Sequence, residues 1–210
     1  MNIFNFIKIS LIILIVSCND NTKNLAYVGP IEIVNKDTIF HKIPNYPFVD
    51  QYNNQVFTDD FLGKISVVNF FFTTCPSICP KMNNNMVKIQ KYFDVNKINL
   101  ISYTVNPEYD NVEMLNDYAT KINAKSNWFF LTGKKENIYS IAKSGYFISV
   151  KEDKFAPGGF LHSEYFILVD KYGNIRSSFD KYGNVKGVYD GTNDREVSQL
   201  IIDIKTLIKE

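Results

Sequence analysis

The feature that most constrains the fold is an apolar run that ends just before two closely spaced cysteines. Residues 65–72 read Ile-Ser-Val-Val-Asn-Phe-Phe-Phe and are mostly apolar and favourable in β-strands. A run of this kind is typical of a central strand that is buried on both faces. Cys75 and Cys79 follow in the segment Cys-Pro-Ser-Ile-Cys, and an amphipathic helical pattern comes next. The sequence therefore predicts a strand, a turn with two thiols, and a helix.

Strands and helices alternate after this first unit, and short strands precede it. We predict helices over 78–93, 111–122, 135–143 and 194–208, and strands over 98–105, 128–131, 146–150, 163–169 and 175–179. Two small hairpins are predicted before residue 65, over 31–40 and 48–58. Alternation implies a parallel sheet between helices, and the late strand pair adds antiparallel strands. The prediction is an α/β, thioredoxin-like fold with a central mixed sheet flanked by helices and an N-terminal β-hairpin extension.

The N-terminal residues have the pattern of an export signal. One positive charge precedes the apolar run 9–16, and the segment Ile-Val-Ser-Cys that ends at Cys18 resembles a bacterial lipobox. This predicts a lipoprotein signal peptide over 1–17, lipidation of Cys18, a tether over 18–29 and the domain over 30–210. The alternative is an uncleaved N-terminal helix, although the apolar stretch is shorter than the roughly 20 residues that span a bilayer. Either reading puts the domain outside the cytoplasm at a membrane, which we expect to be bacterial and to expose it to the periplasm.

Composition limits the functions that the chain can have and the residues that can carry them. The formal net charge is +1 and there is no long basic run, so nucleic-acid binding has no electrostatic support. The chain has three cysteines and two histidines. If Cys18 carries lipid, Cys75 and Cys79 are the two thiols that remain, in a compartment where disulfides persist. We expect His41 to be a surface residue, because no motif surrounds it.

The cysteine pair lies where ligands gather in α/β sheets, at the carboxyl end of a central strand. The start of the following helix should lower the thiol pKa values, because it favours negative charge. Two adjacent thiolates can act as a soft-metal clamp or as a redox pair, and both need the same geometry. Soft, low-valent copper prefers thiolates, and an imidazole would complete a three-coordinate site. His162, just before the strand 163–169 and after Gly158-Gly159, is the candidate third ligand.

The same residues also fit two purely structural roles. Cys75 and Cys79 could form a structural disulfide, although a bridge between residues so close in sequence constrains little chain. His162 could be an ordinary surface or core histidine.

Three segments resemble the Sco/SenC family of copper-binding assembly factors. Residues 67–82 read Val-Val-Asn-Phe-Phe-Phe-Thr-Thr-Cys-Pro-Ser-Ile-Cys-Pro-Lys-Met, 103–110 read Tyr-Thr-Val-Asn-Pro-Glu-Tyr-Asp, and 161–173 contain Leu-His-Ser and Leu-Val-Asp-Lys-Tyr-Gly. The resemblance implies a thioredoxin fold, binding of Cu(I) and Cu(II) by Cys75, Cys79 and His162, and a role in building the CuA centre of cytochrome c oxidase. Asn106 stands where the family usually has Asp, so hydrogen bonding is kept there but the charge is lost.

We therefore carry three hypotheses. The first is a metallochaperone that delivers copper to the CuA-bearing subunit of cytochrome c oxidase. The second is a thiol–disulfide reductase in which Cys75 attacks and Cys79 resolves, with a thiol reductant protein as a further partner. The third is a non-catalytic binding module whose disulfide has no activity. Whether the protein is an enzyme stays open between them.

Overall fold

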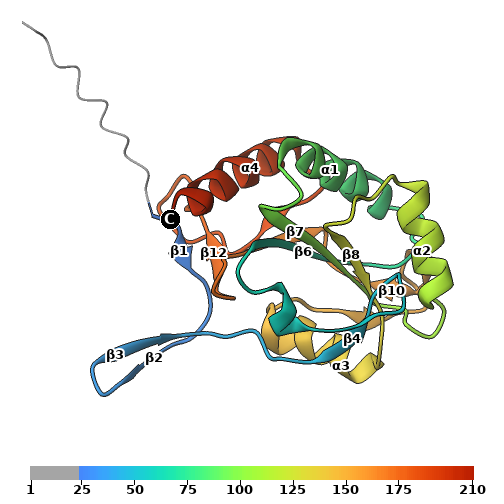
Figure 1. Ribbon diagram of the computed structural model, residues 1–210, viewed down its shortest axis with the longest axis horizontal. Helices are drawn as coiled ribbons and strands as arrows, with labels where there is room; N and C mark the ends of the chain where they lie inside the picture. The colour runs from blue at the N-terminus through green and yellow to red at the C-terminus, as the bar shows by residue number, and fades with distance from the viewer. Residues whose placement is uncertain (1–23) are drawn as a thin grey trace, which may run out of the picture.

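The computed structural model describes residues 24–210, and it contains a sheet of seven strands (Figure 1). The sheet order is β1-β12-β11-β6-β7-β8, and β13 also pairs with β11. These strands are β1 (Ala26–Tyr27), β6 (Ile65–Phe71), β7 (Ile98–Thr104), β8 (Trp128–Leu131), β11 (Tyr165–Val169), β12 (Ile175–Ser177) and β13 (Tyr189–Asp190). β6, β7 and β8 are parallel, whereas β11 runs antiparallel to β6. The predicted mixed, thioredoxin-like sheet is confirmed.

The predicted central strand is β6, and all seven of its residues are buried. Helices cover both of its faces because its side chains are apolar on both sides. In Figure 1, α1 (Cys79–Tyr92), α2 (Val112–Lys121) and α4 (Asp194–Lys209) lie on one face, and α3 (Lys135–Ser140) lies on the other. The apolar stripe of α1, which includes Met82 and Met86, is fully buried against the sheet.

Two hairpins precede β6, as predicted. The first joins β2 (Ile31–Val34) to β3 (Asp37–Phe40), and the second joins β4 (Pro47–Val49) to β5 (Gln55–Phe57), which η1 (Thr58–Phe61) follows. Asn35 and Lys36 turn the first hairpin with φ of 52° and 72°. A two-residue turn with both φ values positive matches the twist of the strands that it joins.

The structure differs from the expectation in two places. Residues 146–150 form no strand, because α3 continues into the π-helical turn η2 (Ile141–Gly145) and the chain then runs to β9 (Lys151–Glu152). β9 pairs with β10 (Phe160–Leu161) beyond the short turn η3 (Pro157–Gly159). Near the N-terminus, Ala26 and Tyr27 belong to the sheet as β1, although we expected a tether as far as residue 29. These two residues become a strand because their backbone pairs with β12, and no local sequence pattern predicts that pairing.

The predicted signal peptide and Cys18 lie outside the described residues. Within residues 24–210, no helix has the length and apolar character needed to cross a membrane.

Candidate metal and dithiol site

The two cysteines follow the carboxyl end of β6, as predicted. The chain turns sharply there, since the Cys75 amide donates a hydrogen bond to the Phe72 carbonyl at 3.2 Å. α1 then begins at Cys79, with Pro80 in its first turn, a position where proline loses no helical hydrogen bond. Both thiols are free; Cys75 is partly exposed and Cys79 is buried. Cys75 is therefore the less buried of the two cysteines.

His162 folds back over this pair from a distant part of the sequence. Its Nε2 lies 3.4 Å from Cys79 Sγ and 3.7 Å from Cys75 Sγ. The donor atoms of all three residues lie within 4.8 Å of one another. Metal–sulfur and metal–nitrogen bonds of about 2.0–2.3 Å separate neighbouring ligands by roughly 3.5–4 Å. The three side chains are thus spaced as the ligands of a single ion would be.

The imidazole is oriented by contacts on its other side. His162 Nδ1 lies 3.1 Å from the Ser163 carbonyl, which can accept its proton. The Phe72 ring meets the imidazole edge-on, with 5.6 Å between ring centroids. A hydrogen bond from Nδ1 to a carbonyl places the free lone pair on Nε2 and fixes the ring, as in many metal-binding histidines. Nε2 is the atom that faces the sulfurs.

A glycine lets the histidine-bearing segment approach the cysteine turn. Gly158 has φ +77°, and a Cβ built on it would lie 2.6 Å from the Phe72 ring and 3.1 Å from Pro76. The position of Gly158-Gly159 shortly before His162 suggested that this loop lets the histidine reach the sulfurs. The structure gives Gly158 a steric role in that approach, because a Cβ there would clash with the Phe72 ring. Gly159 has open space around it.

The two thiols differ strongly in acidity. The pKa of Cys75 falls to about 3, chiefly because the Cys79 thiol donates a hydrogen bond to it; burial opposes this, and His162 lowers the pKa further. The pKa of Cys79 is raised far above its ordinary value by its role as that donor, by burial, and by the negative charges of Cys75 and Asp110. One proton is thus shared by the pair, with the thiolate on Cys75.

A buried carboxylate, which the sequence patterns did not mark as a site residue, holds the cysteine turn. Asp110 is fully buried and accepts hydrogen bonds from the Thr73 amide at 3.1 Å, from the Thr73 hydroxyl and from the Thr104 hydroxyl. Thr73 opens the cysteine turn and Thr104 ends β7, so Asp110 ties two neighbouring strand ends together. Thr104 was the available signal, because it lies at the end of the predicted strand 98–105 and a buried hydroxyl nearly always has a hydrogen-bond partner.

Asn106 contributes through its backbone. Its amide donates to the Thr104 hydroxyl at 3.0 Å, and its carbonyl accepts from the Asp110 amide at 2.9 Å. The loop that carries Asp110 is thereby closed on itself.

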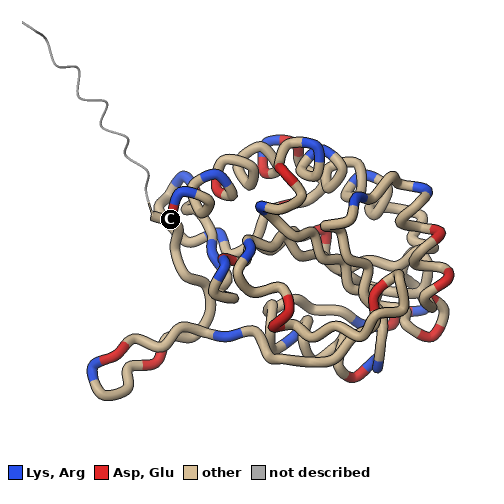
Figure 2. Tube along the Cα trace, in the orientation of Figure 1, with Lys and Arg blue, Asp and Glu red and all other residues tan. Residues whose placement is uncertain are grey.

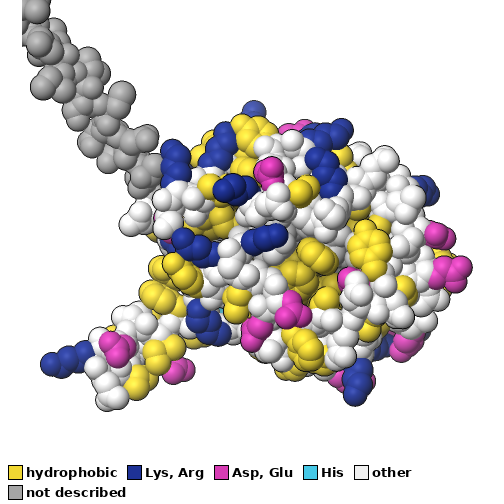
Figure 3. All heavy atoms as spheres, viewed as in Figure 1, with side chains coloured by type: hydrophobic (Ala, Val, Ile, Leu, Met, Phe, Trp, Pro, Cys, Tyr) yellow, Lys and Arg dark blue, Asp and Glu magenta, His cyan; other side chains and the backbone are white. Residues whose placement is uncertain are grey.

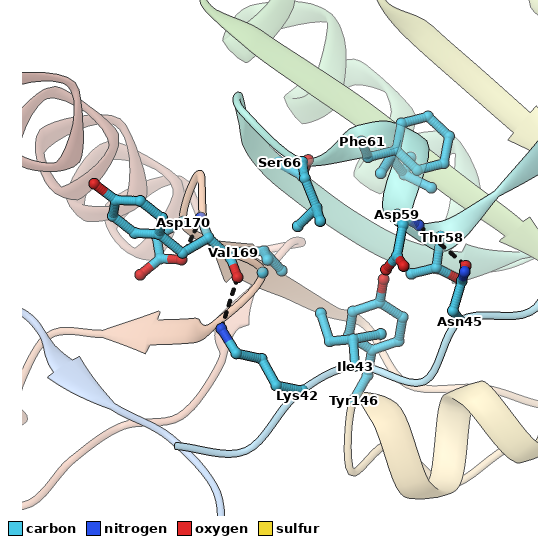
Figure 4. A pocket seen from close by; sticks show the side chains of 14 residues that line it. Lys42, Ile43, Asn45, Thr58, Asp59, Phe61, Ser66, Tyr146, Val169 and Asp170 are labelled. Atoms are coloured by element: carbon cyan, nitrogen blue, oxygen red, sulfur yellow. Dashed lines mark hydrogen bonds between the residues drawn. The ribbon is translucent and has the colours of Figure 1, made fainter. Parts of the chain in front are cut away.

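A separate pocket of about 440 Å³ lies at the other end of β6, lined by apolar residues together with Lys42, Asp59 and Tyr146 (Figure 4). Ser66, near the start of β6, belongs to its wall, and neither Cys75 nor Cys79 does. This pocket is therefore distinct from the cysteine–histidine group.

The donor set can do two kinds of chemistry. Two thiolates and an imidazole suit soft or borderline ions such as Cu(I). A low-pKa, partly exposed thiol beside a buried one suits thiol–disulfide exchange. Fold and site together define a thioredoxin-fold protein with a dithiol and a histidine positioned as a soft-metal donor set.

Comparison with known proteins identifies the family. The SCO1/SenC family model matches residues 36–194. This chain belongs to the SCO1/SenC family.

Three solved structures are similar to this chain. A SCO1/SenC family lipoprotein from Bacillus anthracis is 29% identical, with a TM-score of 0.68 over 79% of this chain and 94% of that chain. BsSco, described as a member of the Sco family of cytochrome c oxidase assembly proteins, is 25% identical, with a TM-score of 0.67 over 80% and 94%. Arabidopsis thaliana ScoI, solved with copper bound, is 20% identical, with a TM-score of 0.62 over 79% and 99%.

Proposed function

We propose that this protein binds one copper ion through Cys75, Cys79 and His162 and delivers it to the CuA site of cytochrome c oxidase during assembly. The observation that carries the proposal is the convergence of His162 Nε2 on both sulfurs, at 3.4 and 3.7 Å. Support also comes from two relatives, since ScoI has been solved with copper and BsSco is described as an oxidase assembly protein.

The chemistry of the site suits a carrier that must release its cargo. Cysteine binds metal as thiolate, and the low pKa of Cys75 supplies one thiolate without base. Cys79 must lose its proton when metal binds, so copper loading should release a proton. Cys75 is the partly exposed ligand. A thiolate of the acceptor protein would therefore reach the ion from the side of Cys75, and copper would pass by stepwise ligand exchange.

The test is a copper titration of the reduced protein, compared between wild type and His162→Ala. We expect His162→Ala to weaken Cu(I) affinity and to change the spectrum of the Cu(II) form, since an imidazole ligand is lost. His41→Ala is the matched control: His41 Nε2 bonds the Gly145 carbonyl, away from the thiols, and its loss should leave the titration unchanged. Equal affinity for wild type and His162→Ala would remove the histidine from the site.

A second function, thiol–disulfide reduction, is favoured by the asymmetry of the two thiols. The Cys75 thiolate would attack a partner disulfide, form a mixed disulfide and release one partner thiolate. Cys79 would then lose its proton, attack Cys75 Sγ and release the second partner thiol, leaving a Cys75–Cys79 disulfide. Two electrons would move to the partner, such as the oxidised CuA cysteines, and a thiol reductant protein would restore the pair.

Trapping tests this second function. Cys79→Ser should accumulate a mixed disulfide through Cys75, whereas Cys75→Ser should accumulate none. A Cys79→Ser variant that traps no oxidase subunit would argue against the reductase role and leave copper delivery intact.

We also propose that Cys18 carries a lipid that anchors the domain to the periplasmic face of a bacterial membrane. The lipobox-like segment supports this, as does the description of the Bacillus anthracis relative as a lipoprotein. Mass spectrometry of the membrane fraction should find diacylglycerol on Cys18. Cys18→Ser should release the protein from membranes, and a variant that stays bound without lipid would contradict the anchor.

A further inference from the structure

The β2–β3 hairpin is exposed along almost its whole length. Ile33 is 78% exposed and Ile31 is 54% exposed, and Val34 and Ile39 are also exposed. A two-stranded hairpin without a packed face is only marginally stable in water. Clustered apolar side chains that no other residue of 24–210 covers indicate a contact surface.

One face of the hairpin is more apolar than the other. Ile31 lies opposite Phe40, and Ile33 lies opposite Thr38, so these four side chains share a face. The other face carries Val34 and Ile39 together with the charged Glu32 and Asp37. The base of this face is fixed, because Phe40 stacks on Tyr27 with 3.7 Å between ring centroids. The hairpin projects away from the body of the domain, and apolar side chains are visible along it (Figures 1 and 3).

The hairpin lies at the end of the molecule where the chain enters the fold. Arg176 donates hydrogen bonds to the Leu25 carbonyl and to the Glu210 carboxylate, so the entry point lies beside the C-terminus. Ser66, near the start of β6, pairs with Val169 just before the turn into β12. The cysteines follow the other end of β6, about 20 Å away for a seven-residue strand. Figure 1 shows β1, the C-terminus and the hairpin at the left, and β10, next to His162, at the right.

We propose that the β2–β3 hairpin inserts Ile31 and Ile33 into the interface of the bilayer that anchors the protein, so that the copper site faces away from the membrane. This inference rests on the proposed lipid at Cys18. Six residues lead from Cys18 to Asn24, and they span at most about 20 Å. The hairpin is therefore held within reach of the bilayer. Burial of apolar side chains in the interface provides the free energy of contact.

Charge does not explain the contact. Glu32, Lys36 and Asp37 are the charged residues of the hairpin, and both signs are present (Figure 2). A surface that bound acidic lipid headgroups electrostatically would be basic. The proposed contact is therefore apolar and should persist at high salt, because salt screens charge interactions and leaves apolar burial in place.

The test is fluorescence quenching by brominated lipids, using the full-length protein extracted from membranes. The chain has one tryptophan, Trp128, which is fully buried and sets the baseline. Ile33→Trp places an emitter on the hairpin, and Phe155→Trp places one at an 88% exposed position of the loop between β9 and β10, at the site end. In phosphatidylethanolamine and phosphatidylglycerol vesicles with brominated acyl chains, we expect the Ile33→Trp emission to be largely lost and the Phe155→Trp emission to be unchanged.

The outcomes separate this inference from the proposed function. Ile33→Trp emission that is not quenched while the protein stays on the vesicles would overturn the hairpin contact and would favour a protein partner for this face. Equal quenching of both variants would overturn the outward orientation of the site. Protein that leaves the vesicles would overturn the lipid anchor together with this inference, whereas the copper titration would be unaffected.

Discussion

At the scale of single residues, two cysteines four positions apart have opposite properties. Cys75 lies in the turn before α1, is partly exposed and has a lowered pKa, whereas Cys79 is the first residue of α1 and is buried with a raised pKa. Each pKa shift has the same cause, because the protonated Cys79 donates a hydrogen bond that stabilises the thiolate of Cys75. This asymmetry would decide which sulfur a partner meets first, both in the proposed copper transfer and in the proposed disulfide exchange.

We predict that Cys75 reacts with iodoacetamide at a rate that is nearly constant between pH 5 and pH 8. With a pKa of about 3, Cys75 is already thiolate throughout that range, so added protons do not remove the nucleophile. An ordinary thiol with a pKa of about 8.5 would instead slow about tenfold for each unit of falling pH. Mass spectrometry of the alkylated protein measures the rates, and the urea-unfolded chain is the control. A tenfold loss per unit in the folded protein would contradict the lowered pKa.

Asp110 acts as a positioning residue, since it holds Thr73 and is not one of the three residues whose donor atoms converge. We predict that Asp110→Ala costs about 2–4 kcal/mol of unfolding free energy, because three donors lose a charged, buried acceptor. Copper affinity should fall as well, because the cysteine turn is no longer held. Urea unfolding and copper titration measure the two effects.

Asp117, an exposed residue of α2, offers the matched control. Asp117→Ala should change the unfolding free energy by no more than about 0.5 kcal/mol. If Asp110→Ala behaved like Asp117→Ala in both measurements, the carboxylate would have no positioning role.

At the scale of elements, the β9–β10 hairpin and the turn between its strands bring His162 to the cysteines. This segment has few residues in regular structure, and its approach depends on close contact with Phe72 and Pro76 at Gly158. The histidine is therefore placed by steric fit between two loops, and the local sequence pattern around it gives little sign of this.

We predict that Gly158→Ala weakens copper binding and that Gly159→Ala does so far less. Both glycines have positive φ, so both substitutions carry backbone strain of about 1 kcal/mol. Only at Gly158 would the new Cβ also meet the Phe72 ring, which would push the His162 segment away from the sulfurs. Copper titration of the two variants isolates the steric contribution. Equal loss of affinity in both would show that strain alone is responsible.

At the scale of the whole molecule, one buried arginine joins the two ends of the described chain. Arg176 in β12 pairs with Asp170 at 3.1 Å and with Glu210 at 3.0 Å, and it also donates to the Leu25 carbonyl. Its guanidinium lies 4.3 Å from the centre of the Tyr27 ring. These contacts hold β1 against the sheet, and they set the point from which any N-terminal tether leaves the domain.

We predict that Arg176→Met destabilises the fold by about 3–5 kcal/mol, because the substitution leaves Asp170 as a buried charge without its cation. Lys88→Met breaks the exposed pair with Asp194 and should cost no more than about 1 kcal/mol. Urea unfolding of both variants provides the comparison. A small effect at Arg176 would mean that the termini are held mainly by the backbone pairing of β1.

Local sequence patterns determined most of the secondary structure and the position of the cysteine pair. Residues close together in the sequence are enough to predict several elements, because the periodicity of apolar residues and the turn residues are local. These elements are the buried strand 65–72, the amphipathic helices and the two N-terminal hairpins. The position of the cysteine pair followed from the same logic, because a strand-turn-helix unit places its turn at the sheet edge. The absence of a strand at 146–150 shows the limit of such patterns, since a short apolar segment can pack without pairing.

Tertiary structure alone decided the rest. Asp110 reaches Thr73 across 37 positions in sequence, and His162 reaches Cys75 across 87. Three further features arise between segments that are distant in the chain or buried together. They are the pairing of β1 with β12, the fit of Gly158 against Phe72 and the difference in pKa between the two thiols. Their energies depend on distance and burial in the folded molecule, quantities that no local pattern of residues contains.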